Sequence, residues 1–211
     1  FILDILLLQV GENLTWRELE GYMGCLSGTR QRGIMKKKSD GDRINALLSQ
    51  LLILSELSRR TKLPLRKLKF ELGTHGKPYL KAGGVQFSLS HTRGAICAAF
   101  SDKEEIGVDI ERRDRRVNEA MYKRVLSDEE TFHLTSNGDF LRFWVQKEAF
   151  LKRLGIGITR DLRGVNSLEL PDTTAIEFGG YFVGVSGKGA LDAVISEVSV
   201  KEVLSGYVLE V

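Results

Sequence analysis

The stretch Ile106-Gly-Val-Asp-Ile-Glu111 alternates apolar and acidic side chains, which is the pattern of a half-buried strand. Side chains two residues apart on a strand point to the same face, so Asp109 and Glu111 share one face while Val108 and Ile110 turn into a core. Two carboxylates on one face repel each other unless a cation lies between them. The stretch therefore predicts either a magnesium-binding strand or a solvated strand whose acids pair with the neighbouring arginines.

Upstream of this strand, the chain mixes short strands with one long helix. The apolar run 1–10 is interrupted by an acid and has no cleavage site, so it predicts a buried strand rather than a signal peptide. Apolar residues recurring at the helical period predict a helix over 39–60 that begins at the N-cap Ser39. Further strands are expected at 68–72, 85–89 and 95–100, with residues 90–94 as the turn between the last two.

Downstream, the pattern changes to helices and then returns to strands. Helices are expected at 121–125, after Ser127 and at 140–154, and the remainder predicts mainly strands, the last over 205–211. The order mixes helices and strands without a long βαβ series, so the fold class is α+β. The polar break over 102–105 predicts a boundary near residue 102, which gives an N-terminal unit over 1–102 and a C-terminal unit over 103–211.

The segment Phe143-Trp-Val-Gln-Lys-Glu-Ala-Phe-Leu-Lys152 places another acid on the last helix. Trp144, Glu148 and Lys152 lie four residues apart and share one stripe. An aromatic residue favours an inward stripe, and a buried carboxylate needs a cation or several donors. Glu148 is therefore interpreted as a third acid that completes a metal site or acts as a base. The alternative is an exposed Glu148–Lys152 pair.

Two shorter motifs are less specific. Phe87-Ser-Leu-Ser-His-Thr92 places Ser90 and His91 in a turn, where the histidine either bonds to local backbone or contacts a phosphate. A hydrolase-type Ser–His pair is poorly supported because no G-x-S-x-G elbow is present. Gly76-Lys77-Pro78 is a rigid turn that presents a lysine. No P-loop and no dinucleotide fingerprint occur, so neither an ATPase nor a Rossmann enzyme is indicated.

The composition excludes several classes of protein. The net charge is +3, from 31 basic and 28 acidic residues, which is too balanced for a general nucleic-acid binder. No apolar stretch approaches the roughly 20 residues of a membrane span. Cys25 and Cys97 lie far apart without a CxxC motif, so neither a disulfide nor a zinc site is expected and a reducing, cytoplasmic setting is favoured. The basic run over 30–38 predicts either a solvated face or an anion site.

In chain order, the four motifs Gly76–Pro78, Phe87–Thr92, Gly107–Glu111 and Phe143–Lys152 resemble those of the 4′-phosphopantetheinyl transferases. The chain is most similar to their larger, two-subdomain class, the kind that activates surfactin synthetase. The resemblance covers about residues 25–170, and the segment after about residue 172 carries no motif that matches.

The resemblance implies two similar α/β subdomains related by a pseudo-twofold axis, with coenzyme A in the cleft between them. It implies an enzyme that uses Mg²⁺ and transfers 4′-phosphopantetheine from coenzyme A to a serine of an apo acyl or peptidyl carrier protein, releasing 3′,5′-ADP. Such carriers serve fatty acid, polyketide or nonribosomal peptide synthesis. A single chain can hold the whole cleft, so a monomer is expected, with neither nucleic acid nor membrane as a partner.

The resemblance also assigns roles to individual residues. Asp109, Glu111 and Glu148 match the magnesium-binding acids, and Asp109 counts among the catalytic residues. Glu148 also matches the residue that deprotonates the carrier serine. Lys152 matches the lysine that contacts a phosphate of coenzyme A and assists the leaving group. Contacts to coenzyme A are assigned to Arg43, Lys77, Ser90, His91 and Lys152, with Arg30 or Lys38 in support.

Small departures from the family pattern remove no reacting group. Ser88 replaces a frequent asparagine, Thr92 replaces the usual serine, and Gln146 stands where a smaller or hydrophobic residue is common. Glu130 falls on a further family element that begins at Leu126. Two alternatives stay open on the sequence alone: another magnesium-dependent phosphoester enzyme, such as a phosphohydrolase, and a non-catalytic module that binds coenzyme A or a carrier.

Overall fold

The computed structural model describes residues 3–157 and 161–207. Its strands are β1 (Leu3–Gln9), β2 (Phe70–Leu72), β3 (Pro78–Leu80), β4 (Gln86–Thr92), β5 (Ala95–Ser101), β6 (Gly107–Arg112), β7 (Thr173–Phe178), β8 (Tyr181–Ser186) and β9 (Ile195–Val198). Its α-helices are α1 (Trp16–Leu19), α2 (Gly28–Met35), α3 (Asp40–Thr61), α4 (Glu119–Val125), α5 (Asp128–His133), α6 (Asn137–Leu154) and α7 (Val200–Ser205). The α+β class expected from the sequence is confirmed.

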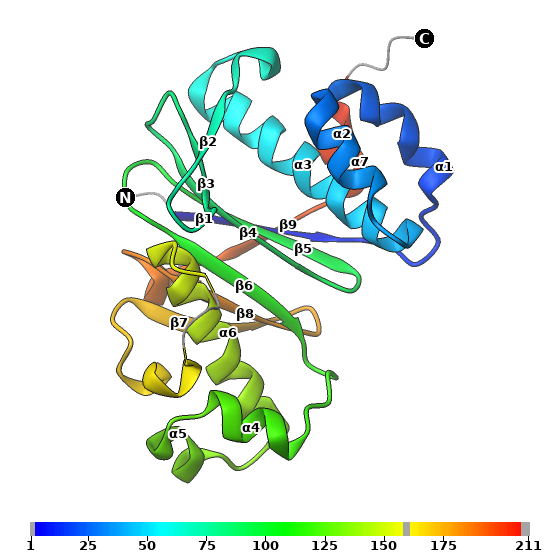
Figure 1. The fold of residues 1–211 in the computed structure, drawn as a ribbon. Helices are drawn as coiled ribbons and strands as arrows, with labels where there is room; N and C mark the ends of the chain where they lie inside the picture. The colour runs from blue at the N-terminus through cyan, green and yellow to red at the C-terminus, as the bar shows by residue number, and fades with distance from the viewer. Residues whose placement is uncertain (1–2, 158–160, 208–211) are drawn as a thin grey trace.

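Two sheets pack against each other between two long helices (Figure 1). The first sheet has the order β4-β5-β1-β9 and the second has the order β6-β8-β7, while β2 and β3 form a separate hairpin. Apolar side chains of β1 and β5 meet those of β6 and β8 in one buried cluster between the sheets. Helix α3 packs on the outer face of the first sheet, and α6 packs on β6 and β8 of the second.

Strand β1 is apolar at nearly every position because both of its faces are covered. Ile5 and Leu7 belong to the cluster between the two sheets. Leu8, on the other face, packs in the cluster that includes α3. A strand buried on both faces needs a continuous apolar run rather than an alternating one, which explains the opening segment of the sequence.

Helix α6 lies directly on the backbone of the second sheet at two glycines. A Cβ at Gly107 would stand 1.9 Å from the carbonyl oxygen of Ala149, and one at Gly184 would stand 2.0 Å from that of Val145. Gly184 pairs with Asp109 across β6 and β8. These glycines let the helix approach close enough to bring Glu148 beside the strand that carries Asp109.

Several expected elements are confirmed with small shifts of their ends. Helix α3 begins after Ser39, whose side chain accepts a hydrogen bond from the Asp42 amide. Helix α5 begins with the capping box of Ser127 and Glu130. The opening strand, the strand over 106–110 and the helix over 140–154 all form.

Two local predictions are wrong. Residues 90–94 are not a turn, because β4 continues through Thr92 and only Arg93 and Gly94 connect it to β5. Gly94 has φ of +82°, which permits so tight a connection. The strand expected from residue 205 is also wrong where it can be checked, because Ser205 ends helix α7, which starts from a capping box at Ser199. Residues 208–211 lie outside the described part of the chain.

The segment after residue 190 returns to the first sheet. Strand β9 runs parallel to β1, and α7 packs against α3 (Figure 1). The Tyr207 hydroxyl donates to the Leu51 carbonyl at 2.6 Å. In the described ranges, no helix combines the length and the hydropathy needed to cross a membrane.

Candidate active site

The predicted acids lie where the two sheets meet edge to edge. Strand β4 is an edge of the first sheet and β6 is an edge of the second, and the two strands lie beside each other. The buried hydroxyl of Ser88 accepts a hydrogen bond from the Val108 amide at 3.0 Å. An edge strand leaves some backbone amides without a partner strand. Here the Ser88 hydroxyl of β4 accepts the hydrogen bond of the Val108 amide in place of a backbone carbonyl.

Asp109 and Glu111 are each held by one hydroxyl and one cation. The Ser90 hydroxyl and the Lys152 ammonium both donate to Asp109 Oδ1 at 2.7 Å. The Thr92 hydroxyl donates to Glu111 Oε1 at 2.9 Å, and Arg115 forms an ion pair with Glu111 Oε2. Both acids are buried. The alternative of a solvated strand is therefore wrong.

Glu148 is buried beside Asp109 and Glu111, but its Oε1 has no hydrogen-bond donor of the kind that holds those two acids. Its side chain is 2% exposed, and its Oε1 is buried without a hydrogen-bond partner. Burial and the negative charge of Asp109 raise the pKa of Glu148 to about 7, while Lys152 acts in the opposite direction. The alternative of an exposed Glu148–Lys152 pair is wrong, because Lys152 reaches Asp109 instead.

The chemistry of these donors fits a hard divalent cation. The three acids offer only carboxylate oxygens, which Mg²⁺ prefers as ligands. The buried Oε1 of Glu148 has no hydrogen-bond partner, and a cation would stabilise it there. Within the described residues, no three His, Cys, Asp or Glu side chains lie close enough to form a metal site as they stand. The positive charges beside Asp109 and Glu111 are those of Lys152 and Arg115.

A pocket of about 540 Å³ lies at one side of the acids and gathers three of the predicted coenzyme contacts, Arg30, Lys77 and Lys152. The Arg30 guanidinium lies over the Phe70 ring at 4.4 Å and donates to the Gln50 side chain at 2.6 Å. Apolar groups of β2 and β4 line much of the wall. A cavity of this kind, apolar with a few converging cations, suits a flat ring system that carries phosphates.

Lys77 is already engaged within the protein. Its ammonium donates to the backbone carbonyls of Arg153 at 2.8 Å and Ile106 at 3.2 Å. Burial lowers the pKa of Lys77, as does the positive charge of Arg153, while Glu105 acts in the opposite direction. The lysine thus links the β2–β3 hairpin to the end of α6, and its contact with coenzyme A stays a prediction.

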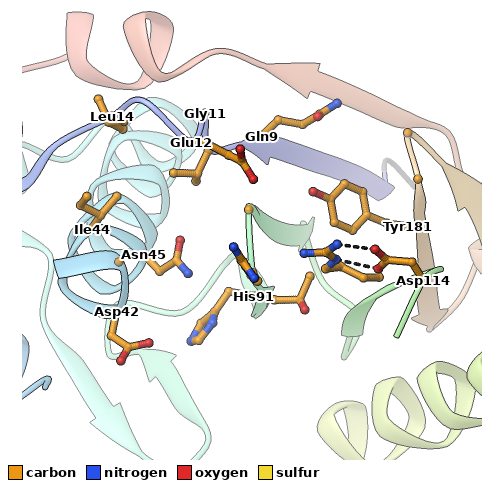
Figure 2. Close-up of a pocket in the computed structure, with 18 of the residues that line it drawn as sticks. Gln9, Gly11, Glu12, Leu14, Asp42, Ile44, Asn45, His91, Asp114 and Tyr181 are labelled. Carbon is orange, nitrogen blue, oxygen red and sulfur yellow. Dashed lines mark hydrogen bonds and ion pairs between the residues drawn. The ribbon is translucent and has the colours of Figure 1, made fainter. Parts of the chain in front are cut away.

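A larger hollow of about 1340 Å³ lies next to His91 and is lined by residues of β1, α3, β4 and β8. Figure 2 shows His91, Asp42 and Tyr181 around it, from β4, α3 and β8 respectively. His91 is exposed on β4. Partial loss of solvent around its ring lowers its pKa, as do the charges of Lys152 and Lys37, while Asp42 and Asp109 act in the opposite direction. The histidine thus lies between the acids and the start of α3, and both positive and negative side chains surround it.

The remaining predicted contacts cluster at the start of α3. Arg43 pairs with Asp40 at 2.8 Å, and its Nε is buried without a hydrogen-bond partner. Lys38 is exposed just before the helix. The basic run over 30–38 is thus divided, because Arg30 turns into the smaller pocket while Lys38 faces solvent.

Sequence reasoning missed two side chains that contact the acids. Thr92 lies two residues after Ser90, and this spacing places both side chains on one face only because β4 continues through Thr92 instead of turning at Ser90. Arg115 follows Glu111 by four residues in a connecting segment, where spacing gives no clear signal. The Arg115 guanidinium also lies over the Trp144 ring at 5.5 Å. Trp144 itself is half-buried.

Paired strand acids, a buried helix carboxylate and a lysine beside a nucleotide-sized pocket define a class of site suited to chemistry on phosphate esters. The profile of the 4′-phosphopantetheinyl transferase superfamily matches residues 105–208. The chain belongs to this superfamily.

Individual relatives agree with this assignment. The chain is 27% identical over 176 residues to the 4′-phosphopantetheinyl transferase Sfp of Bacillus subtilis, covering 76% of this chain and 78% of that protein. It is 31% identical over 157 residues to the L-aminoadipate-semialdehyde dehydrogenase-phosphopantetheinyl transferase of Saccharomyces cerevisiae, covering 68% of this chain. The chain spans only 58% of that yeast protein. The HetI transferase of Nostoc is 33% identical over 105 residues, 44% of each chain.

Proposed function

We propose that this protein transfers 4′-phosphopantetheine from coenzyme A to a serine hydroxyl of an apo carrier protein and releases 3′,5′-ADP. The observation that carries the proposal is Glu148, a buried carboxylate with a pKa of about 7 beside Asp109 and Lys152. A group with such a pKa can accept a proton near neutral pH. The names of the relatives support the same reaction.

Coenzyme A would lie in a cleft between the units 1–102 and 103–211, which we propose to be two related subdomains. The pocket of about 540 Å³ supports this placement, because residues of both units line it. Arg30, Lys77 and Lys152 would approach the nucleotide part, and His91 a phosphate. Arg43 would bind the 3′-phosphate, with support from Lys38. The orphaned Nε of Arg43 is consistent with an anionic ligand.

In the proposed reaction the serine oxygen forms a bond to the β-phosphorus of coenzyme A, and the bond from that phosphorus to the oxygen of 3′,5′-ADP breaks. Glu148 takes the serine proton, directly or through a water. Lys152 balances the negative charge that grows on the departing phosphate. Asp109 holds Lys152 in place at 2.7 Å.

The residues that would hold Mg²⁺ are Asp109, Glu111 and Glu148, and the bound ion would neutralise charge on the phosphate oxygens. The buried Oε1 of Glu148, which has no hydrogen-bond partner, supports this set, because a buried carboxylate needs a positive partner. One chain supplies every residue named for the site, and we propose that it acts as a monomer.

The experiment is a mass measurement on the carrier. The protein is incubated with coenzyme A, Mg²⁺ and a panel of apo carriers from fatty acid, polyketide and nonribosomal peptide systems. The expected result is a carrier heavier by one phosphopantetheine group, together with 3′,5′-ADP. Release of nucleotide without any modified carrier would instead indicate a phosphohydrolase, and the absence of both products would contradict the proposed transfer.

A further inference from the structure

Strand β4 presents a hydroxyl at every second position toward β6. The Ser88 hydroxyl accepts from the Val108 amide, while the Ser90 and Thr92 hydroxyls donate to Asp109 and Glu111 respectively. The residue numbers rise together on both strands, so the two edges follow each other side by side. Since side chains two apart share a face of a strand, the three hydroxyls form one row along the junction of the sheets.

Two hydroxyls of this row donate hydrogen bonds to the strand acids Asp109 and Glu111, and none donates to Glu148 Oε1. Asp109 receives Ser90 and the cation Lys152, while Glu111 receives Thr92 and the cation Arg115. Glu111 Oε1 also accepts from the Arg112 amide at 2.9 Å. Asp109 is thus held at Oδ1 by two donors from different elements, and Glu111 is held at both of its carboxylate oxygens.

A hydroxyl has a single proton to donate. While the Ser90 proton is given to Asp109, it cannot also be given to a phosphate, whose oxygens are acceptors. The same holds for Thr92 and Glu111. The contact with coenzyme A that the family resemblance assigns to Ser90 and the contact with Asp109 seen here therefore compete for one proton, and an experiment can separate them.

We propose that Ser90 and Thr92 are positioning residues that orient the carboxylates of Asp109 and Glu111 toward the position of a divalent cation. The proposal rests on the proposed function for the role of the ion, but the contacts that carry it are independent of the reaction. Partners of metal ligands commonly change metal affinity by about 10–100-fold when they are removed.

The first test compares Thr92→Val with Thr92→Ser. Valine keeps the branched shape and removes the hydroxyl, whereas serine keeps the hydroxyl. Thr174→Val is the matched control, because Thr174 is half-buried on β7, outside the site. The probe is Mn²⁺, which shares the oxygen preference of Mg²⁺, measured by the loss of the free-ion electron paramagnetic resonance signal.

Thr92→Val is expected to weaken Mn²⁺ binding by about 10-fold, while Thr92→Ser and Thr174→Val stay within about twofold of the unsubstituted protein. A thermal melt of each variant is recorded alongside. Equal Mn²⁺ affinity in Thr92→Val and the unsubstituted protein would overturn the proposal for Thr92. So would an absence of Mn²⁺ binding in the unsubstituted protein.

The second test separates the two roles of Ser90. Ser90→Ala is titrated with Mn²⁺ and, separately, with coenzyme A by calorimetry. A positioning role predicts weaker Mn²⁺ binding, again by about 10-fold, with coenzyme A affinity unchanged in the absence of the ion. The reverse result, weaker coenzyme A binding and unchanged Mn²⁺ binding, would overturn the proposal for Ser90.

These outcomes are distinguishable from failure of the proposed function. Ion binding is measured without a carrier, so it is read whether or not transfer occurs. Normal transfer with unchanged Mn²⁺ affinity in Thr92→Val would remove the positioning role and leave the function intact. Weakened Mn²⁺ affinity in Thr92→Val, together with no carrier modification by the unsubstituted protein, would support the positioning role and contradict the proposed function.

Discussion

The Lys152 ammonium on α6 donates to Asp109 Oδ1 on β6 at 2.7 Å, which joins the helix motif to the strand motif. The contact spans two segments that lie far apart in the sequence. It also sets Lys152 apart from Glu148, its neighbour one helical turn earlier. The lysine is thus aimed at the strand acid, and the buried glutamate is left without that partner.

Replacement of this lysine is the first prediction. Lys152→Met removes the cation that faces Asp109 and, in the proposed reaction, the charge that assists the leaving group. We expect the single-turnover rate constant for carrier modification to fall by about 10²-fold or more. Carrier mass spectrometry under single-turnover conditions measures the rate. The control is Lys123→Met, which breaks an exposed pair with Glu119 on α4 and is expected to leave the rate unchanged. A near-normal rate in Lys152→Met would contradict the role of the lysine.

The second prediction concerns pH and Glu148. Its ordinary pKa is 4.5 and its folded pKa is about 7, so between these values the folded protein keeps a proton that the unfolded chain has released. The free energy of unfolding therefore decreases as pH rises through this window. Glu148→Gln removes this loss and is expected to stabilise the protein at pH 8 by on the order of 1–3 kcal/mol. The difference should vanish by about pH 4, where both states bind the proton.

Denaturant melts of the two proteins without added divalent ions, at a series of pH values, check this expectation. His133→Gln, at an exposed position on α5, serves as a control for general effects of pH. A constant difference between Glu148→Gln and the unsubstituted protein across the series would show that burial does not raise the pKa of this carboxyl.

The third prediction concerns the glycine that begins the strand motif. A Cβ at Gly107 would lie 1.9 Å from the Ala149 carbonyl oxygen and 2.5 Å from the Arg153 amide, so α6 must move. Overpacking of this kind typically costs about 1–3 kcal/mol, and more where a backbone is the obstacle. We expect Gly107→Ala to lower the melting temperature strongly and to displace Glu148. Gly33→Ala is the control, because a Cβ there meets open space in α2 and is expected to be neutral or slightly stabilising.

The sequence made the site predictable where periodicity and chemistry coincide. Alternation placed Asp109 and Glu111 on one face, and helical spacing placed Glu148 and Lys152 on one stripe. It could not show that Lys152 would reach Asp109, because that contact depends on how closely α6 approaches β6. That approach depends on Gly107 and Gly184, whose role appears only when helix and sheet are seen together.

Other features escaped prediction for different reasons. Helices α1 and α2 lie in a segment dotted with glycines, which obscure a helical pattern. The extension of β4 to Thr92 depends on a connection of only Arg93 and Gly94, and the sequence alone favoured a longer turn. Strand β9 joins β1 from the far end of the chain, and local patterns carry no information about such a partner.

The last prediction concerns a buried ion pair whose lysine, Lys147, directly precedes Glu148 in the sequence. Lys147 and Glu130 are both fully buried and pair with each other. The lysine also donates to the carbonyls of Val125 at 2.6 Å and Leu162 at 2.9 Å, so all three of its protons are used. The pair therefore fixes the rotation of α6 against the segments that precede and follow it.

Lys147→Met leaves the Glu130 carboxylate buried without its cation, which typically costs about 3–5 kcal/mol. The double variant Lys147→Met, Glu130→Gln removes both charges and is expected to recover a large part of that loss, since replacing a whole buried pair is far less costly than breaking it. Urea unfolding of Lys147→Met, of Glu130→Gln and of the double variant measures both quantities. If the double variant is as unstable as the sum of the single variants, the energy lies in the surrounding hydrogen bonds rather than in the pairing of the two charges.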